Sequence, residues 1–131
     1  MPLKKYPKLQ YTKVIQILYG NIYNVWNFLV LPFRNNVKNI LGFHPCIVVE
    51  KEYFRKRITL CPGTSKKQSK KQIHLNVPKG TKQGLKKNTN FLINKKFPIA
   101  ECRLHEPALV NYLGKAPKNK LDELHSLLTN D

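Results

Sequence analysis

Acidic residues are scarce in this sequence: 7 Asp and Glu stand against 24 Lys and Arg, which leaves a formal net charge of +17. The scarcity is greatest in residues 51–99, where Glu52 is the one acid among many lysines and arginines. No two carboxylates share the apolar body, so acid–base chemistry of the glycosidase type has no candidate residues. A basic middle region favours a polyanionic partner, because neutralised phosphates release condensed counterions. Nucleic acid is the first such partner, while an acidic protein partner or a merely solvated surface stays open.

Cysteine is also sparse, with three widely spaced residues, Cys46, Cys61 and Cys102. An odd number at such spacing indicates no disulfide framework and predicts buried, inert thiols in a reducing, cytoplasmic compartment. No uninterrupted apolar segment with a cleavage site follows Lys4 and Lys5, so no secretory signal is expected. The histidines and cysteines lack the close-pair spacing of a zinc site, and neither a metal nor a cofactor is expected.

Several motifs are missing. Neither GxxxxGK[ST] nor GxGxxG occurs, which removes the phosphate cradle that nucleotide hydrolysis needs, and there is no nucleophile elbow. The longest uncharged segment, residues 14–33, is interrupted by one glutamine, three asparagines and Gly20. Each side-chain amide would need a partner in hydrocarbon, so this segment is expected in a soluble core and not in a membrane.

Short apolar runs separated by polar turns are what the sequence does hold, and 41% of its 131 residues are hydrophobic. That content suits one folded domain. Alternating or continuous apolar runs predict six strands. They are expected over residues 21–31, 46–50, 57–61, 72–78, 90–94 and 97–104. Residues 34–45 are expected to form a loop and residues 50–56 a charged hairpin turn.

The C-terminal segment has a different period. Leu121, Leu124 and the pair 127–128 form one apolar stripe at helical spacing. Asn119 is the expected N-cap, and the acidic residues 122 and 123 would then lie in the first turn. The fold class is therefore mainly β (α+β), a small, partly closed antiparallel barrel with a C-terminal amphipathic helix. Residues 1–18 are expected to be a basic arm, and residues 19–131 the barrel domain.

One short stretch combines a hydroxyl-rich turn with dense positive charge. Gly63, Thr64 and Ser65 end an apolar run, and four lysines follow within six positions. Backbone N–H groups of such a turn can hold an anion, and a hydroxyl can donate to it. Turn chemistry or a solvated loop explains the same residues without a ligand.

The order of these pieces along the chain resembles the MazF/PemK (Kid-like) toxins of type II toxin–antitoxin systems, and the Gly-Thr-Ser turn fits a PemK-like subgroup best. The segments that carry the resemblance are GNIYNVWNFLVLPF, GFHPCIVVE, ITLCPGTSKK, IHLNVP, GLKKNTNFLI and LGKAPKNKLDELHSLL. They span roughly residues 19–128. The resemblance implies an SH3-like, plasmid-maintenance-toxin barrel, usually a homodimer, that cleaves single-stranded RNA without a metal. It also implies an acidic antitoxin whose flexible tail occupies the RNA groove.

The resemblance further implies three catalytic candidates. His44 precedes Pro45 where the family has a catalytic arginine before proline, and an imidazole can move a 2′-hydroxyl proton near neutral pH. Thr64, with Ser65 beside it, keeps the hydroxyl that would hydrogen-bond the scissile phosphate. A solvated loop histidine is the alternative interpretation of His44.

Basic residues around these positions are the nucleic-acid-binding candidates. They are Lys66, Lys67, Lys70, Lys71, Lys86, Lys87, Lys95, Lys96, Arg55 and Arg57. Three positions depart from the family pattern. Phe97 falls on a basic position, and Asn94 and Asn21 fall on acidic ones, so Lys95 and Lys96 would supply the charge as flexible points.

Two alternatives to an endoribonuclease toxin follow from these departures and from the fold. One is a catalytically degenerate barrel that binds nucleic acid or an acidic protein without cleavage, with steeply salt-dependent affinity. The other is a gyrase-directed poison on the same fold, which the sequence neither supports nor excludes.

Overall fold

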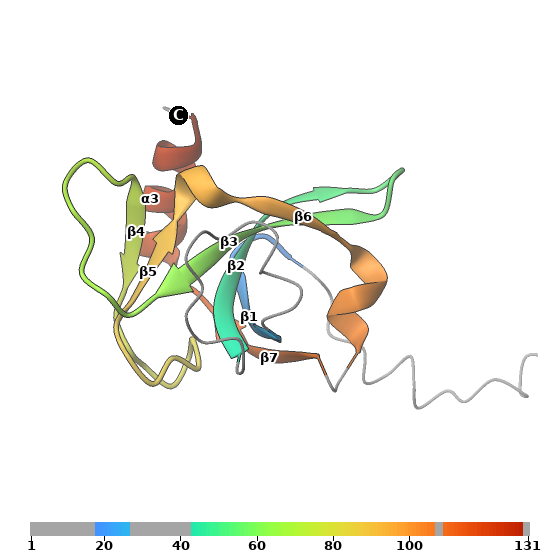
Figure 1. Cartoon of the computed structure of the whole chain (residues 1–131), viewed down its shortest axis with the longest axis horizontal. Coiled ribbons are helices and arrows are strands. Elements are labelled where there is room, and N and C mark those ends of the chain that lie inside the picture. Colours follow the sequence, from blue (N-terminus) through green and yellow to red (C-terminus); the bar gives the residue numbers. More distant parts are fainter. Residues whose placement is uncertain (1–17, 27–42, 107–108, 130–131) are drawn as a thin grey trace, which may run out of the picture.

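A computed structural model describes residues 18–26, 43–106 and 109–129, and within these residues the protein has seven antiparallel strands and one α-helix (Figure 1). The strands are β1 (Asn21–Trp26), β2 (Phe43–Glu52), β3 (Arg57–Thr64), β4 (His74–Val77), β5 (Thr89–Leu92), β6 (Phe97–Ala100) and β7 (Val110–Lys115). The helix is α3 (Lys118–Thr129), and two 3₁₀ turns, η3 (Ile93–Lys95) and η4 (Glu101–His105), follow β5 and β6. The predicted arm, residues 1–18, lies outside the described residues except for Leu18.

Strand order in the sheet is β4-β5-β3-β2-β1-β7, and β6 pairs with β3 beside this path. Strand β3 pairs with two further strands besides β2. Its residues 57–60 pair with β6, and its last two residues pair with β5. The path runs from β4 to β7 and is not closed. The expected mainly β fold with a C-terminal helix is thus confirmed, as an open sheet.

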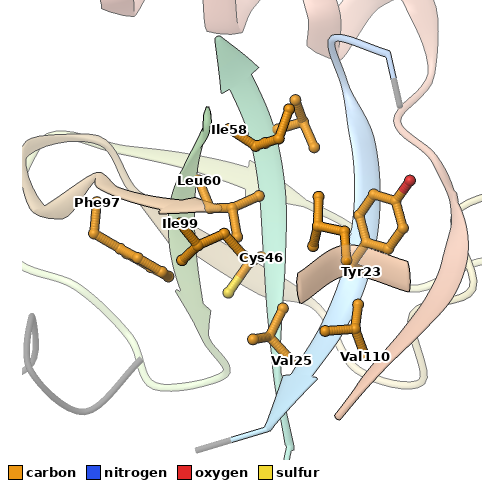
Figure 2. Packing of buried hydrophobic residues seen from close by; sticks show 10 residues of the cluster. Tyr23, Val25, Cys46, Ile58, Leu60, Phe97, Ile99 and Val110 are labelled. Atoms are coloured by element: carbon orange, nitrogen blue, oxygen red, sulfur yellow. The ribbon is translucent and has the colours of Figure 1, made fainter. Parts of the chain in front are cut away.

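Strict alternation along the central strands buries side chains on both faces of the sheet. On one face, Tyr23, Cys46 and Leu60 belong to a first apolar cluster that β6 and η4 complete. Figure 2 shows these side chains packing between the strands, with Phe97 and Ile99 reaching in from β6. Burial raises the pKa of the Tyr23 phenol, which keeps it neutral at physiological pH.

The other face carries a second apolar cluster, to which Ile22, Ile47 and Cys61 contribute from the same three strands. Phe91 of β5 and Leu124 of α3, both fully buried, close this cluster. The leucine stripe predicted at the C-terminus therefore packs α3 against the sheet, on the face opposite the first cluster.

Strand ends differ from the expectations in several places. The predicted loop 34–45 is wrong at its end, because β2 already begins at Phe43. Strand β3 runs three residues further than expected, to Thr64, whereas β6 ends at Ala100 and continues as η4. Strands β4 and β5 are also shorter than predicted, and β1 is confirmed to Trp26, beyond which the expectation lies outside the described residues.

The C-terminal predictions need two corrections. Strand β7 was not expected, although it covers a whole edge of β1. Helix α3 begins at Lys118, so Asn119 lies inside the first turn and is not its N-cap, and no acidic residue stands in that turn. The carbonyl of Pro117 instead accepts the N–H groups of Lys120 and Leu121 at 2.9 and 3.0 Å.

Two glycines allow the turn after β4 to touch β7. Gly84 has φ +68°, and a Cβ on it would lie 2.3 Å from the carbonyl oxygen of Leu113. Gly114 faces it, with its own Cβ position 2.1 Å from the carbonyl oxygen of Lys82. The backbone N–H of Lys115 donates to the same Lys82 oxygen at 3.3 Å. The backbones therefore meet where no side chain fits.

Two of the three thiols are buried as expected, Cys46 and Cys61, whereas Cys102 is exposed in η4, which corrects that part of the prediction. Among the described residues, no helix has the length and apolar character needed to cross a membrane.

Candidate functional site

The beginning of β2 and the end of β3 bring His44 and Thr64 to the same end of the sheet. The two strands are antiparallel, and their pairing stops at Cys46 opposite Pro62. His44 lies two residues before that pair and Thr64 two residues after it, so alternation places both side chains on the face of the first cluster. Both residues are partly exposed, and His44 also pairs with Val25 of β1.

The Thr64 hydroxyl caps the turn that follows β3. Its oxygen accepts the backbone N–H of Lys66 at 3.2 Å, a short-range turn contact. A hydroxyl that accepts in this way still carries its own hydrogen to donate. Ser65, beside it, is exposed. The turn therefore presents hydroxyl groups where the lysine run begins.

Residues 65–73 form the connection from β3 to β4, which we call the lysine loop. It holds Lys66, Lys67, Lys70 and Lys71, all exposed, and no acidic residue. Figure 1 shows it projecting at the left, beside β4. The first of these four lysines stands two residues after Thr64.

Amide side chains anchor the lysine loop at both ends. Near its start, Asn90 Nδ2 donates to the Lys66 carbonyl at 3.0 Å. Near its end, Gln72 donates a short hydrogen bond to Asn94 in η3, and the Ile93 N–H donates to the Ile73 carbonyl at 3.1 Å. The loop thus has a defined path at its base.

The remaining lysines of the predicted set fall into two places. Lys86 and Lys87 are exposed just before β5, whose second residue, Asn90, is paired with Thr64. Lys95 and Lys96 lie at the end of η3, next to the residue that binds Gln72 of the lysine loop. Both pairs therefore border the region around Thr64 and the loop.

Arg55 and Arg57 are separated from this region. They lie at the β2–β3 turn, at the other end of β3, and seven residues of extended chain put Arg57 roughly 23 Å from Thr64. Both bind Glu52, at 3.8 and 3.4 Å. Figure 1 shows this hairpin on the side opposite the lysine loop. Its tip carries Phe54, which is fully exposed.

Two of the three positions that depart from the family pattern are buried in this chain. Phe97 is fully buried in the first cluster and pairs with Leu60, so its side chain cannot replace a surface arginine. Asn21, at the start of β1, is 2% exposed. Within the described part of the chain, no three His, Cys, Asp or Glu side chains are grouped as a metal site would need.

Sequence reasoning missed two asparagines beside Thr64. Asn90 of β5 is only 8% exposed, and its Oδ1 accepts a hydrogen bond from Asn76 of β4 at 2.8 Å. The available signal was an asparagine directly before the apolar residues Phe91, Leu92 and Ile93, in a strand where asparagine is rare without a specific partner.

Comparison with solved structures identifies proteins that share this fold. MazF from Deinococcus radiodurans superposes with a TM-score of 0.60 at 16% identity, covering 89% of this chain and 96% of that one. A MazE–MazF crystal structure from the same organism (form II) gives a TM-score of 0.58 at 13% identity, covering 90% and 95%. At such identities these likenesses establish the fold alone.

Comparison of sequences is decisive for the family. No individual protein of curated function matches the chain. The sequence model of one family, however, described as PemK-like, MazF-like toxins of type II toxin–antitoxin systems, matches residues 24–130. That match covers β2 to α3 entirely, including the β3 turn and the lysine loop. The chain belongs to the family of PemK-like, MazF-like toxins of type II toxin–antitoxin systems.

Proposed function

We propose that this protein is a metal-independent endoribonuclease that cleaves single-stranded RNA and is neutralised by an acidic antitoxin. One observation supports this above all. In a chain of this toxin family, a histidine and a threonine hydroxyl share one end and one face of the sheet, and the lysine loop follows the threonine directly. Positive charge, a hydrogen-bond donor and a proton carrier are the groups that transesterification of RNA requires.

The proposed reaction is an in-line attack of the ribose 2′-oxygen on the adjacent phosphorus. The P–O5′ bond breaks, leaving a 2′,3′-cyclic phosphate on one fragment and a 5′-hydroxyl on the other. His44 accepts the proton of the attacking 2′-hydroxyl, and the departing 5′-oxygen takes a proton from water. The Thr64 hydroxyl donates to a non-bridging oxygen as charge develops there. The lysine loop raises the local concentration of the polyanion.

The test is a gel of a long single-stranded RNA incubated with purified protein in excess EDTA. We expect discrete fragments that carry 2′,3′-cyclic phosphates and 5′-hydroxyls, and the same RNA in a duplex should stay intact. Intact single-stranded RNA under these conditions would refute the proposed activity. Fragments that appear only after metal is added would point to a different mechanism.

The proposed partners are an acidic antitoxin and a second copy of the chain. The antitoxin is supported by the MazE–MazF crystal structures of the same fold and by the net charge of +17, which suits an acidic peptide as well as RNA. The homodimer is proposed from the family. A small acidic protein encoded beside this one is expected to stop the cleavage when the two are mixed.

A second candidate function is binding of RNA without cleavage. It is favoured by one observation, the full burial of Phe97 at the position where the family pattern has a basic residue. An enzyme that lacks this cation has lost one source of phosphate stabilisation. Intact RNA in the gel, together with salt-dependent binding that His44→Ala leaves unchanged, would establish this alternative.

Replacing Lys66 and Lys67 together by alanine is expected to weaken RNA binding and flatten its salt dependence. Each phosphate contact to a single strand contributes about 0.7 to the slope of log K against log salt, so the slope should fall by about 1.4. Fluorescence anisotropy of a labelled single-stranded RNA between 50 and ~200 mM salt measures both effects.

The matched control is the double replacement of Lys115 and Lys118 by alanine. Both are exposed, and Lys118 starts α3, which covers the opposite face of the sheet. The control removes the same charge. An equal drop in slope for both variants would mean that net charge, and not the lysine loop, draws the RNA.

A further inference from the structure

Three polar side chains form one row across β4, β5 and β3. Asn76 is paired with Asn90, and Asn90 is paired on its other side with Thr64. Residues directly opposite each other in antiparallel strands project from the same face. Their neighbours Leu75 and Phe91 are fully buried in the second cluster, so the row faces away from α3.

Hydrogen bonds of fixed direction join Asn76 to Asn90, and Asn90 to the Lys66 carbonyl. The Lys66 carbonyl can only accept, so the group of Asn90 that meets it at 3.0 Å must be Nδ2. Asn90 Oδ1 then points to Asn76, which must donate through its own Nδ2 at 2.8 Å. One backbone carbonyl therefore sets the orientation of both amides.

Burial of Asn90 needs this arrangement. All four residues of β5 are buried, and Asn90 is 8% exposed. A buried amide costs free energy unless its donors and acceptors are satisfied, and asparagine is a poor strand former. The Asn90 side chain makes two hydrogen bonds, one to the Lys66 carbonyl at the start of the lysine loop and one to Asn76 of the row. The hydrogen bonds to the Lys66 carbonyl and to Asn76 therefore account for an asparagine at this buried position.

Asn76 is left with hydrogen-bonding capacity that points away from the protein. The residue is exposed, and within the described part of the chain its side-chain hydrogen bond is the one to Asn90. Its Oδ1, with two lone pairs, and one N–H remain. Two strand spacings separate it from Thr64, about 10 Å, which is the scale on which a base lies from a neighbouring phosphate.

We propose that Asn76, oriented by Asn90, reads the edge of an unpaired base beside the phosphate held at Thr64. Neutral amides read bases, whereas lysines hold phosphates. Because Asn76 keeps one acceptor, Oδ1, and one N–H donor, it selects a base whose Watson–Crick edge places an exocyclic amino group beside an unprotonated ring nitrogen, adenine or cytosine. The choice of RNA as ligand rests on the proposed function, but base reading does not require cleavage.

The experiment measures binding of four labelled 2′-O-methyl octanucleotides, oligo-A, oligo-C, oligo-U and a mixed A/U sequence. The methylated 2′-oxygen cannot attack, so affinity is measured without cleavage. We expect wild type to bind oligo-A or oligo-C roughly 10-fold more tightly than oligo-U, as one base-amide contact allows. Asn76→Ala should remove this preference while affinity for oligo-U stays unchanged.

Two further variants separate base reading from a structural effect. Asn90→Ala removes the acceptor to which Asn76 Nδ2 donates, so it should release the Asn76 side chain from its fixed orientation and also abolish the preference. Asn111→Ala, an exposed asparagine of β7 at the other edge of the sheet, should keep it. Equal binding of all oligomers by wild type, or an unchanged preference in Asn76→Ala, would overturn the proposal.

The outcomes distinguish this proposal from the proposed function. An RNA gel that shows cleavage, with no Asn76-dependent preference, leaves the nuclease standing and removes the base-reading site. An Asn76-dependent preference in a protein that leaves RNA intact supports the base-reading site and removes the nuclease.

Discussion

Thr64→Ala is expected to lower the rate of RNA cleavage by about 100-fold or more, with little change in the RNA concentration for half-maximal rate. Loss of one donor to an oxygen that gains charge in the transition state costs about 10²–10³ in kcat. Binding should persist, because the lysine loop stays in place through its bonds to Asn90 and Asn94. Initial rates of cleavage of one defined RNA, measured over a range of RNA concentrations, give kcat and KM separately.

Two companion variants show whether the hydroxyl itself matters. Thr64→Ser keeps a donor and should retain most of the activity. Thr59→Ala makes the same chemical change in the same strand, at a residue of similar burial roughly 17 Å away, where the hydroxyl binds Glu50 at 3.5 Å. If Thr59→Ala lost as much activity as Thr64→Ala, the Thr64 hydroxyl would have no special place in the reaction.

Gly84→Ala is expected to lower the free energy of unfolding by about 3 kcal/mol or more. The left-handed φ of +68° already costs an alanine roughly 1–2 kcal/mol. The added Cβ would also lie 2.3 Å from the Leu113 carbonyl oxygen, so β7 or the turn must move. For a domain of this size, the melting temperature should fall by roughly 10 °C.

Gly80→Ala is the matched control in the same turn. Its Cβ would meet the end of the Gln83 side chain, 2.7 Å from Nε2, and a side chain can shift where a backbone carbonyl cannot. The expected loss is under ~1 kcal/mol. Thermal unfolding followed by circular dichroism compares the two. Equal melting temperatures would contradict the close approach of the turn and β7.

Local patterns carried most of the fold prediction. The central strands were predictable because polar and apolar residues alternate along them in the sequence itself, as in the segment around Ile58 and Leu60. Strand β7 escaped because Leu113 is an extra residue between the pairs Gly114–Ile22 and Tyr112–Tyr23, which breaks the two-residue period.

Pro45 likewise prevented the beginning of β2 from being predicted from the sequence. A proline suggests a loop, yet the pairing of β2 with β3 ends at Cys46, so Pro45 lies where β2 pairs with β1 alone. A strand tolerates proline where the ladder needs no donor. Without the register, the sequence could not show that His44 lies in a strand, β2, which begins one residue earlier.

The candidate site was predictable only in its local part. Thr64 and the four lysines of the lysine loop are adjacent in the chain, so composition revealed them. The asparagine row depends on residues 14 and 24 positions from Asn90, at Asn76 and Lys66, which only the strand pairing brings together. Arg55 and Arg57 lie apart from the lysines for the converse reason, since they stand at the far end of β3 although they are close to Thr64 in the sequence.

The two buried thiols can report on the order in which parts of this protein unfold. Cys46 belongs to one apolar cluster and Cys61 to the other, although their strands are direct neighbours and Cys61 is paired with Ile47. A reagent that labels sulfhydryls reaches each only when its own side of the sheet opens, while Cys102 reacts from the start. Labelling order would therefore tell whether α3 and the β6–η4 segment detach from the sheet together or one after the other.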